Sequence, residues 1–204
     1  MIRSFVVVLY HGEIPWKELL EMDEMIDMVP GAERNLLRYL LILIDVSIIP
    51  KNELNKGHPA LQALLETLQL ASQGKLVAEF EHIADHFTAI KHDPRTKSWL
   101  HSLVRYALAV SKIGKELVIK AFSKILDEKE AEKMATSTMQ ELKDEGEAKF
   151  GRNAVLSVLR KRFTKVPPKI ETAIFQMNDP IALESLHSYA LDSQTLDEFA
   201  NALK

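Results

Sequence analysis

The run Phe5–Tyr10 constrains the fold of this chain more than any other segment. All six residues are apolar or aromatic, three of them are valines, and His11 and Gly12 end the run. A short, continuously apolar and β-branched run is typical of a strand covered on both faces, as in a mostly parallel sheet. A strand needs neighbours, and residues 38–47 form the one other segment with a strand pattern. We therefore expect the start of the chain to be the end of an α/β core whose first part is missing.

The rest of the chain has a helical pattern. Leu61, Leu64, Leu65 and Leu68 recur at i, i+3, i+4 and i+7, which predicts a helix with one apolar face. Three more segments with helical periodicity follow before residue 127. The predicted fold class is α+β, mainly α.

The last third of the chain changes from acidic to basic. Residues 127–147 carry eight Asp and Glu against three Lys, whereas residues 149–169 carry seven Lys and Arg and no acid. Gly146 and Gly151 interrupt the helical pattern, because glycine in a helix interior costs about 1 kcal/mol relative to alanine. We predict a linker helix here, followed by a small helical module.

Capping residues divide that module into short helices. Asp179 has the position of a helix N-cap, and Thr195 and Glu198 have the spacing of a capping box. The predicted domain organisation has three parts: the end of an α/β core (1–57), a helical array (58–126), and the linker helix with the C-terminal module (127–204).

Composition excludes several classes of protein. The net charge is −3, so there is no overall basic field that would indicate nucleic acid binding. Cysteine is absent, which excludes disulfides and thiolate zinc sites and fits a reducing compartment. The longest apolar runs fall far short of the roughly 20 residues that span a bilayer. We expect a cytoplasmic protein without a membrane partner.

Two short segments carry a family resemblance. Tyr10, His11 and Gly12 end the first predicted strand, Trp16 follows, and Asp45 lies in an Ile-Asp-Val-Ser sequence in the second. This pattern resembles the Rpn family of recombination-promoting nucleases, also called YhgA-like putative transposases. Two further stretches resemble the family less specifically, the leucine-rich residues 59–70 and residues 145–163.

The resemblance implies a PD-(D/E)xK nuclease fold. Such enzymes cut DNA with Mg²⁺ held by an Asp on one strand and a Glu on the next, beside a Lys or Gln. In the family these residues precede the Tyr-His-Gly strand, and here only residues 1–4 precede it. We therefore expect remnant strands of that core, no catalytic or metal-binding residues, and no cofactor in this chain, although Mg²⁺ is expected for intact members.

Substitute catalytic residues are not evident in the sequence. Glu141 and Lys143, and likewise Glu147 and Lys149, form Glu-x-Lys sequences, but both lie in helical, acid-rich sequence. On a helix, positions i and i+2 point about 200° apart, whereas the chemistry needs both on one face of a strand. We interpret these residues as a solvated helix face, and Asp45 as a structural residue near a strand end.

A histidine pair invites a metal interpretation. His82 and His86 share a helix face at i and i+4, Asp85 lies between them, and Glu79 is a candidate third ligand. An apolar stripe lies beside them, and the spacing fits no familiar zinc enzyme. We therefore favour an exposed polar face and predict no metal.

A basic cluster is the candidate contact for nucleic acid or a partner. It contains Lys149, Arg152, Arg160, Lys161 and Arg162. These side chains could contact phosphate, or pair with the preceding acidic residues within the chain or in a second copy. We favour a surface that faces solvent or a partner over one that binds DNA.

Three functions remain open. The first is a family fragment without nuclease activity. The second is a helical binding module that forms a homo-oligomer, or that associates with a full-length Rpn-type nuclease and inhibits it, because incomplete sheets expose apolar surface. The third is an active enzyme whose true start lies upstream of Met1.

Overall fold

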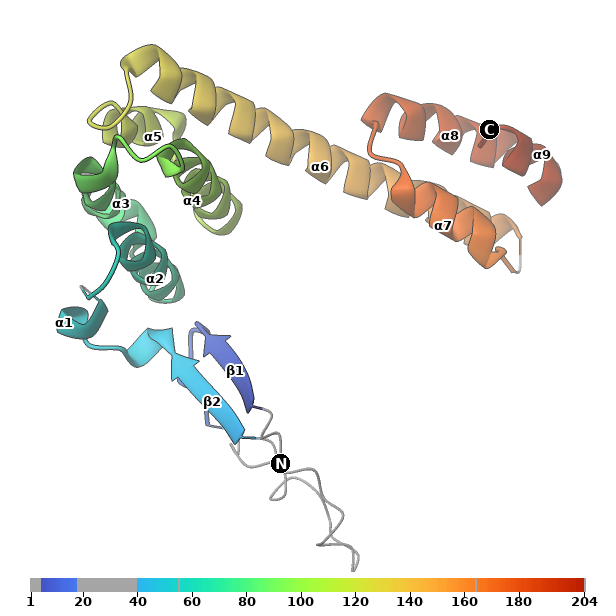
Figure 1. The fold of residues 1–204 in the computed structure, drawn as a ribbon. Coiled ribbons are helices and arrows are strands. Elements are labelled where there is room, and N and C mark those ends of the chain that lie inside the picture. Colours follow the sequence, from blue (N-terminus) through green and yellow to red (C-terminus); the bar gives the residue numbers. More distant parts are fainter. Residues whose placement is uncertain (1–4, 18–39, 55, 164, 204) are drawn as a thin grey trace, which may run out of the picture. The chain divides into compact units, whose positions relative to one another are not determined.

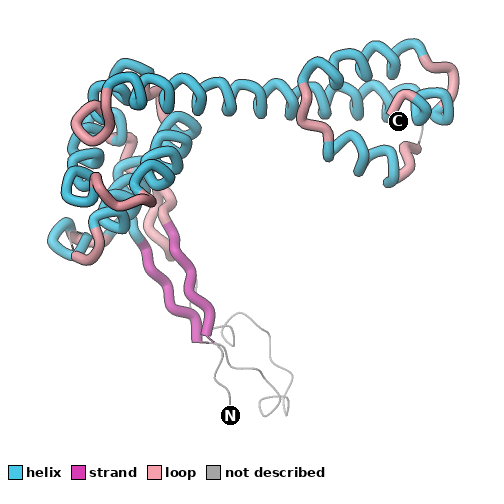
Figure 2. Tube along the Cα trace, turned by 45° about the horizontal axis from the view of Figure 1, so that its top comes forward, coloured by secondary structure: helices cyan, strands magenta, loops and turns pink. Residues whose placement is uncertain are grey.

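A computed structural model describes residues 5–17, 40–54, 56–163 and 165–203 of the chain. The residues group into two compact units, Met1–Ala135 and Thr136–Lys204. Helices make up most of the described residues, with two short strands near the N-terminus (Figures 1 and 2). The predicted class, α+β and mainly α, is confirmed.

The two strands form a parallel pair. β1 (Phe5–Tyr10) has the bounds that the apolar run predicts, and β2 (Leu40–Asp45) pairs with it in register from Phe5 opposite Leu40 to Tyr10 opposite Asp45. The second predicted strand, residues 38–47, begins outside the described residues. It ends earlier than predicted, because a 3₁₀ turn, η2 (Val46–Ile48), follows Asp45 directly.

The strand pair exposes much of its apolar surface. We predicted a strand covered on both faces, yet five apolar side chains of the pair are between 38% and 51% exposed. These side chains are Val6, Val7, Leu9, Ile42 and Ile44. A sheet of two strands buries little surface, since burial of a parallel sheet comes from layers on both faces.

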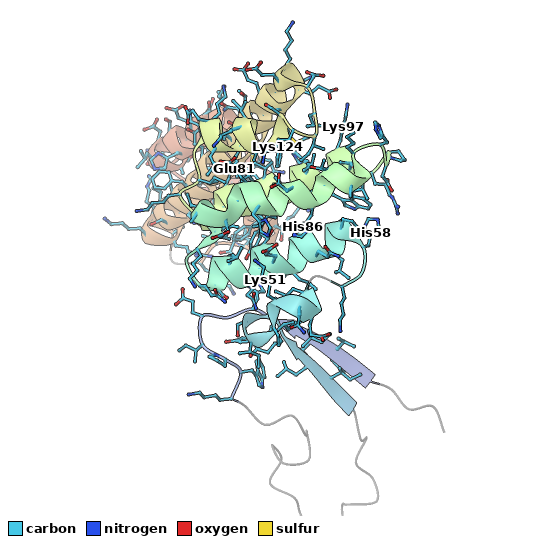
Figure 3. All side chains as sticks on the ribbon, turned by 90° about the vertical axis from the view of Figure 1, so that its left-hand side faces the viewer. Lys51, His58, Glu81, His86, Lys97 and Lys124 are labelled. Carbon is cyan, nitrogen blue, oxygen red and sulfur yellow. The ribbon has the colours of Figure 1, made fainter. Side chains whose placement is uncertain are left out.

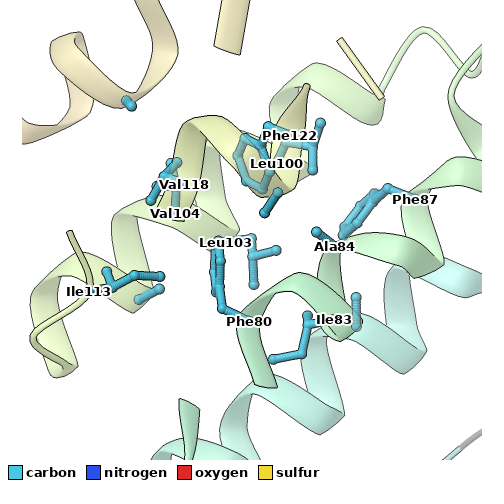
Figure 4. Close-up of a cluster of buried hydrophobic side chains, with 14 of the residues drawn as sticks. Phe80, Ile83, Ala84, Phe87, Leu100, Leu103, Val104, Ile113, Val118 and Phe122 are labelled. Atoms are coloured by element: carbon cyan, nitrogen blue, oxygen red, sulfur yellow. The ribbon is translucent and has the colours of Figure 1, made fainter. Parts of the chain in front are cut away.

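A helical array follows in the same unit. α3 packs against α2 and α5, and α2 packs against α4. Figure 4 shows how α3, α4 and α5 contribute to one core, in which ten side chains are labelled: Phe80, Ile83, Ala84, Phe87, Leu100, Leu103, Val104, Ile113, Val118 and Phe122. The elements are α1 (Lys51–Leu54), α2 (Pro59–Ser72), α3 (Leu76–Asp85), η3 (His86–Ile90), α4 (Thr96–Val110) and α5 (Lys115–Phe122).

The buried face of α2 differs in part from the predicted one. Leu61 and Leu64, which the leucine spacing assigns to the core, are 47% and 49% exposed. Leu68 is buried as predicted, and the other buried residues of the helix are Ala63, Glu66 and Thr67. Small residues let α2 approach α3 and α4 closely, and the buried carboxylate of Glu66 finds partners on α3 and η3.

The described part of the second unit contains helices and the short connections between them. α6 (Glu128–Arg162) begins in the first unit and continues in the second, and α7 (Pro168–Gln176), α8 (Pro180–Asp192) and α9 (Leu196–Asn201) follow. Buried apolar residues of the second unit from all four helices form its core. No described helix is both long and apolar enough to cross a bilayer.

The predicted caps form, but the predicted interruptions do not. Asp179 accepts a hydrogen bond from the N–H of Ile181 (3.0 Å), and Thr195 accepts one from the N–H of Glu198 (3.2 Å). Gly146 and Gly151 lie inside the continuous helix α6. At Gly151 an added Cβ would lie 2.9 Å from the Cβ of Leu183, so this glycine allows α6 and α8 to approach closely.

Candidate functional site

The carboxyl ends of the two strands form the first candidate site. In the parallel register Tyr10 lies opposite Asp45, so both residues end their strands at the same edge of the pair. In open α/β sheets, ligands bind outside this edge. This edge also contains four of the residues that carry the family resemblance, namely Tyr10, Gly12, Trp16 and Asp45.

Asp45 is held by donors of its own chain. Its Oδ1 accepts hydrogen bonds from the backbone N–H (3.0 Å) and the hydroxyl (2.6 Å) of Ser47, and its Oδ2 accepts one from the backbone N–H of Trp16 (2.9 Å). Burial alone would raise the pKa of Asp45, but the hydrogen bonds from Ser47 and Trp16 outweigh it and hold the pKa below its usual value. The carboxylate therefore stabilises the turn after β2.

Tyr10 organises the turn after β1. Its hydroxyl donates to the carbonyl oxygen of Ile14 (2.6 Å), and its ring meets the ring of Trp16 edge-on, with 5.1 Å between centroids. A Cβ at Gly12 would collide with the Tyr10 ring. A larger residue at position 12 would therefore force the Tyr10 side chain to move and to lose its hydrogen bond to Ile14.

His11 contacts a different element. Its ring lies against the ring of Tyr106 in α4, with 6.4 Å between centroids. Partial burial raises the pKa of the Tyr106 phenol. His11 thus links the end of β1 to α4.

Gln69 of α2 was not found from the sequence. Its side-chain amide donates to the carbonyl oxygens of Val46 (2.9 Å) and Ile49 (2.8 Å). The sequence signal for this role was weak: Gln69 is a polar residue between Leu68 and Leu70 in a predicted helix. These bonds tie the turn after β2 to the helical array.

The Glu-x-Lys sequences both lie on α6. Glu141, Lys143, Glu147 and Lys149 are exposed, and Lys143 pairs with Glu147 one turn later, at 3.7 Å. Neither Glu-x-Lys pair can share one face of the helix, because positions i and i+2 diverge by about 200°. Neither pair is arranged for nuclease chemistry.

The three arginines of the basic cluster bind their own unit. Arg152 donates to the carbonyl oxygen of Met177 (2.6 Å), Arg160 pairs with Glu171 (2.7 Å), and Arg162 donates to the carbonyl oxygen of Ala190 (2.6 Å). The contacts of Arg152 and Arg162 are with carbonyl oxygens at the C-terminal ends of α7 and α8, where cations are favourable. Arg160 instead ties α6 to the first turn of α7. Lys149 and Lys161 of the cluster are exposed.

The histidine pair meets a carboxylate that the sequence did not single out. Glu66 of α2, rather than Glu79, faces His82 and His86. Asp85 instead pairs with Lys124, which lies in the turn after α5, at 2.8 Å.

Comparison with known proteins gives a family match for part of the chain. Residues 5–98 match the family described as putative transposase, YhgA-like, which confirms the resemblance carried by the strand ends. The looser resemblance of residues 145–163 lies outside this match and stays a prediction. Neither the curated proteins nor the solved structures gave a match.

Proposed function

We propose that this chain, whose residues 5–98 match the YhgA-like putative transposases, is part of a transposase-like DNA nuclease and does not itself supply the catalytic carboxylates. The bonding of Asp45 carries this proposal. It is the one carboxylate of the two described strands, and both of its oxygens accept hydrogen bonds from the chain. A Mg²⁺ nuclease needs carboxylates that converge on the ion from neighbouring strands.

The helical position of both Glu-x-Lys sequences supports the same proposal. No described strand carries a Glu, a Lys or a Gln. The described residues therefore offer no group beside Asp45 that would position an attacking water in the way the family resemblance implies. The residues after the second strand act instead as a helical support for the strand pair, through the bonds of Gln69.

DNA cleavage tests the proposal. We expect the purified chain to leave supercoiled plasmid intact in Mg²⁺, while a known Mg²⁺-dependent nuclease cuts it under the same conditions. Any trace cleavage would come from a contaminating nuclease. It should therefore be unchanged in the variants Asp45→Asn, Glu141→Gln and Glu147→Gln. Robust cleavage that one of these substitutions abolishes would contradict the proposal.

A second candidate function is association with a full-length Rpn-type nuclease. The observation that favours it is the exposed strand pair, on which Val7 is 51% and Ile42 is 41% exposed. Strands of a parallel pair are normally covered by further layers and flanked by further strands. The family resemblance implies that the sheet of a full-length relative has strands of this kind, so we expect binding to cover the pair and block that relative's activity.

Pull-down with a full-length relative, together with a cleavage assay of that relative, tests this function. We expect binding and inhibition by the wild-type chain and loss of both in Val7→Glu. Val77→Glu is the matched control, because Val77 is similarly exposed (40%) but lies on α3. The function is excluded if the wild-type chain neither binds nor inhibits. A homodimer that Val7→Glu dissociates would instead indicate that the strand pair binds a second copy.

A further inference from the structure

A cluster of three polar side chains lies between α2 and the junction of α3 with η3. The Glu66 Oε2 atom is 2.7 Å from the Nε2 atom of His86, and its Oε1 atom is 3.8 Å from the Nε2 atom of His82. The two imidazole rings are adjacent, with 5.7 Å between their centroids. Each of the three residues offers one potential ligand atom, and these three atoms all lie within 4.8 Å of one another.

The cluster places a carboxylate in the interior without a Lys or Arg partner. The Glu66 side chain is only 9% exposed, and within the described part of the chain its ion-pair partners are these two histidines. Burying a carboxylate is costly unless a cation or good hydrogen bonds compensate. The contact with His86 at 2.7 Å provides such compensation, and a cation bound between Glu66 and the two imidazoles would add to it.

Nearby acidic residues are occupied by other partners. Lys120 of α5 pairs with Glu81 at 2.7 Å, and Lys124 pairs with Asp85 at 2.8 Å. Figure 3 shows Glu81, Lys124 and His86 on neighbouring elements of this unit. The cluster therefore presents a defined donor set of two imidazole nitrogens and one carboxylate.

We propose that Glu66, His82 and His86 bind one Zn²⁺ ion. Two histidines and a glutamate are a donor set that zinc uses when water occupies the fourth position. Bonds of about 2.0–2.1 Å place tetrahedral ligand atoms about 3.4 Å apart. The distances of 2.7 Å and 3.8 Å from Glu66 lie on either side of that value, so small side-chain rotations bring the atoms into position.

Exposure gives the ion an entry path. The His82 side chain is 48% exposed, whereas that of His86 is 16% exposed. The ion would thus enter from the His82 side, where solvent supplies the fourth ligand. Bound there, it cross-links α2 to the junction of α3 and η3. The site is independent of the proposed nuclease relationship, since Zn²⁺ binding needs none of the strand residues.

Titration of the purified chain with Zn²⁺ against a chromophoric zinc indicator tests the site. We expect one saturable site per chain and a higher Tm of the first unit in Zn²⁺, because a ligand that binds the folded state stabilises it. Co²⁺ in place of Zn²⁺ should give the visible absorption of a four-coordinate ion with nitrogen ligands. Absence of saturable Zn²⁺ binding by the wild-type chain would overturn the proposal.

Variants locate the ion. His82→Asn and Glu66→Gln should each weaken Zn²⁺ binding by at least about 100-fold. Loss of a residue that only supports a metal ligand already weakens binding by up to about 100-fold, and these two residues are proposed as ligands themselves. His92→Ala is the control, because His92 is an exposed histidine of the same unit outside the cluster. Circular dichroism checks that each variant is folded, and the exposed His82 is the substitution least able to disturb folding. Equal weakening by His82→Asn and His92→Ala would show that surface histidines bind the metal and would refute the site.

Discussion

The backbone N–H of Trp16 donates to Oδ2 of Asp45 at 2.9 Å, although the two residues are 29 positions apart. The bond joins the segment after β1 to the last residue of β2. Ser47 occupies the other carboxylate oxygen from the following turn. One carboxylate thus fixes both strand ends, which explains an aspartate at this position without invoking a metal.

Removal of that carboxylate should destabilise the first unit. We expect Asp45→Ala to lower the free energy of unfolding by on the order of 2–3 kcal/mol, since three donors lose a charged acceptor. Ser47→Ala removes only one of the donors and should cost less. Urea denaturation followed by tryptophan fluorescence is the measurement, because both tryptophans, Trp16 and Trp99, lie in this unit. Equal stability of Asp45→Ala and the wild type would contradict the role of Asp45.

The contribution of Asp45 should depend on pH. Its pKa is lowered in the folded state, so its stabilising effect is present above the unfolded value of about 3.9 and is lost as pH falls through the folded value. The stability difference between the wild type and Asp45→Asn should therefore be full above about pH 5 and shrink below pH 4. Urea midpoints of both proteins across this range measure it. A difference that stays constant down to pH 3 would refute the assignment.

Two glycines of α6 should respond oppositely to alanine. An added Cβ at Gly151 meets the Cβ of Leu183 at 2.9 Å, whereas one at Gly146 meets nothing within 4 Å. Gly146→Ala should stabilise the second unit by about 0.5–1 kcal/mol through helix propensity. Gly151→Ala should destabilise it on balance, because overpacking costs about 1–3 kcal/mol. Thermal unfolding followed by circular dichroism measures whether each substitution raises or lowers the stability. Stabilisation by both substitutions would contradict the close packing of α6 and α8.

The arginines of the basic cluster should matter for stability more than its exposed lysines. Arg152 donates to Met177 and to the side chain of Asn178, so Arg152→Ala should destabilise the second unit by about 1–2 kcal/mol. Lys161→Ala removes an exposed side chain and should stay within about 0.5 kcal/mol of the wild type. Chemical denaturation followed by circular dichroism compares them. Equal effects of the two substitutions would show that the Arg152 bonds contribute nothing.

Local signals in the sequence predicted several elements correctly. The continuous apolar run gave β1 its bounds, and Asp179 and Thr195 each stand at the helix start that their chemistry favours. These features depend on neighbours in sequence alone. The family resemblance also came from a local motif, the Tyr-His-Gly ending of β1, and the match over residues 5–98 confirms it.

Features that depend on tertiary contacts were missed. Leucine spacing predicted the buried face of α2 only in part: Leu68 is buried, but Leu61 and Leu64 are exposed, because Ala63, Glu66 and Thr67 face the neighbouring helices instead. The helix α6 continues through Gly151, because packing against Leu183 outweighs the poor propensity of glycine. The third member of the histidine cluster lies on α2, and no spacing within one helix could have found it.

Mn²⁺ binding tests the central claim most directly, namely that Asp45 stabilises the strand ends and does not hold a catalytic metal. Mn²⁺ can replace Mg²⁺ at oxygen ligands and enhances the relaxation of water protons when it is protein-bound. We expect Asp45→Asn to give the same Mn²⁺ titration as the wild type, with neither protein cutting plasmid in Mg²⁺. A saturable Mn²⁺ site that Asp45→Asn abolishes, together with Mg²⁺-dependent cleavage by the wild type alone, would contradict the account.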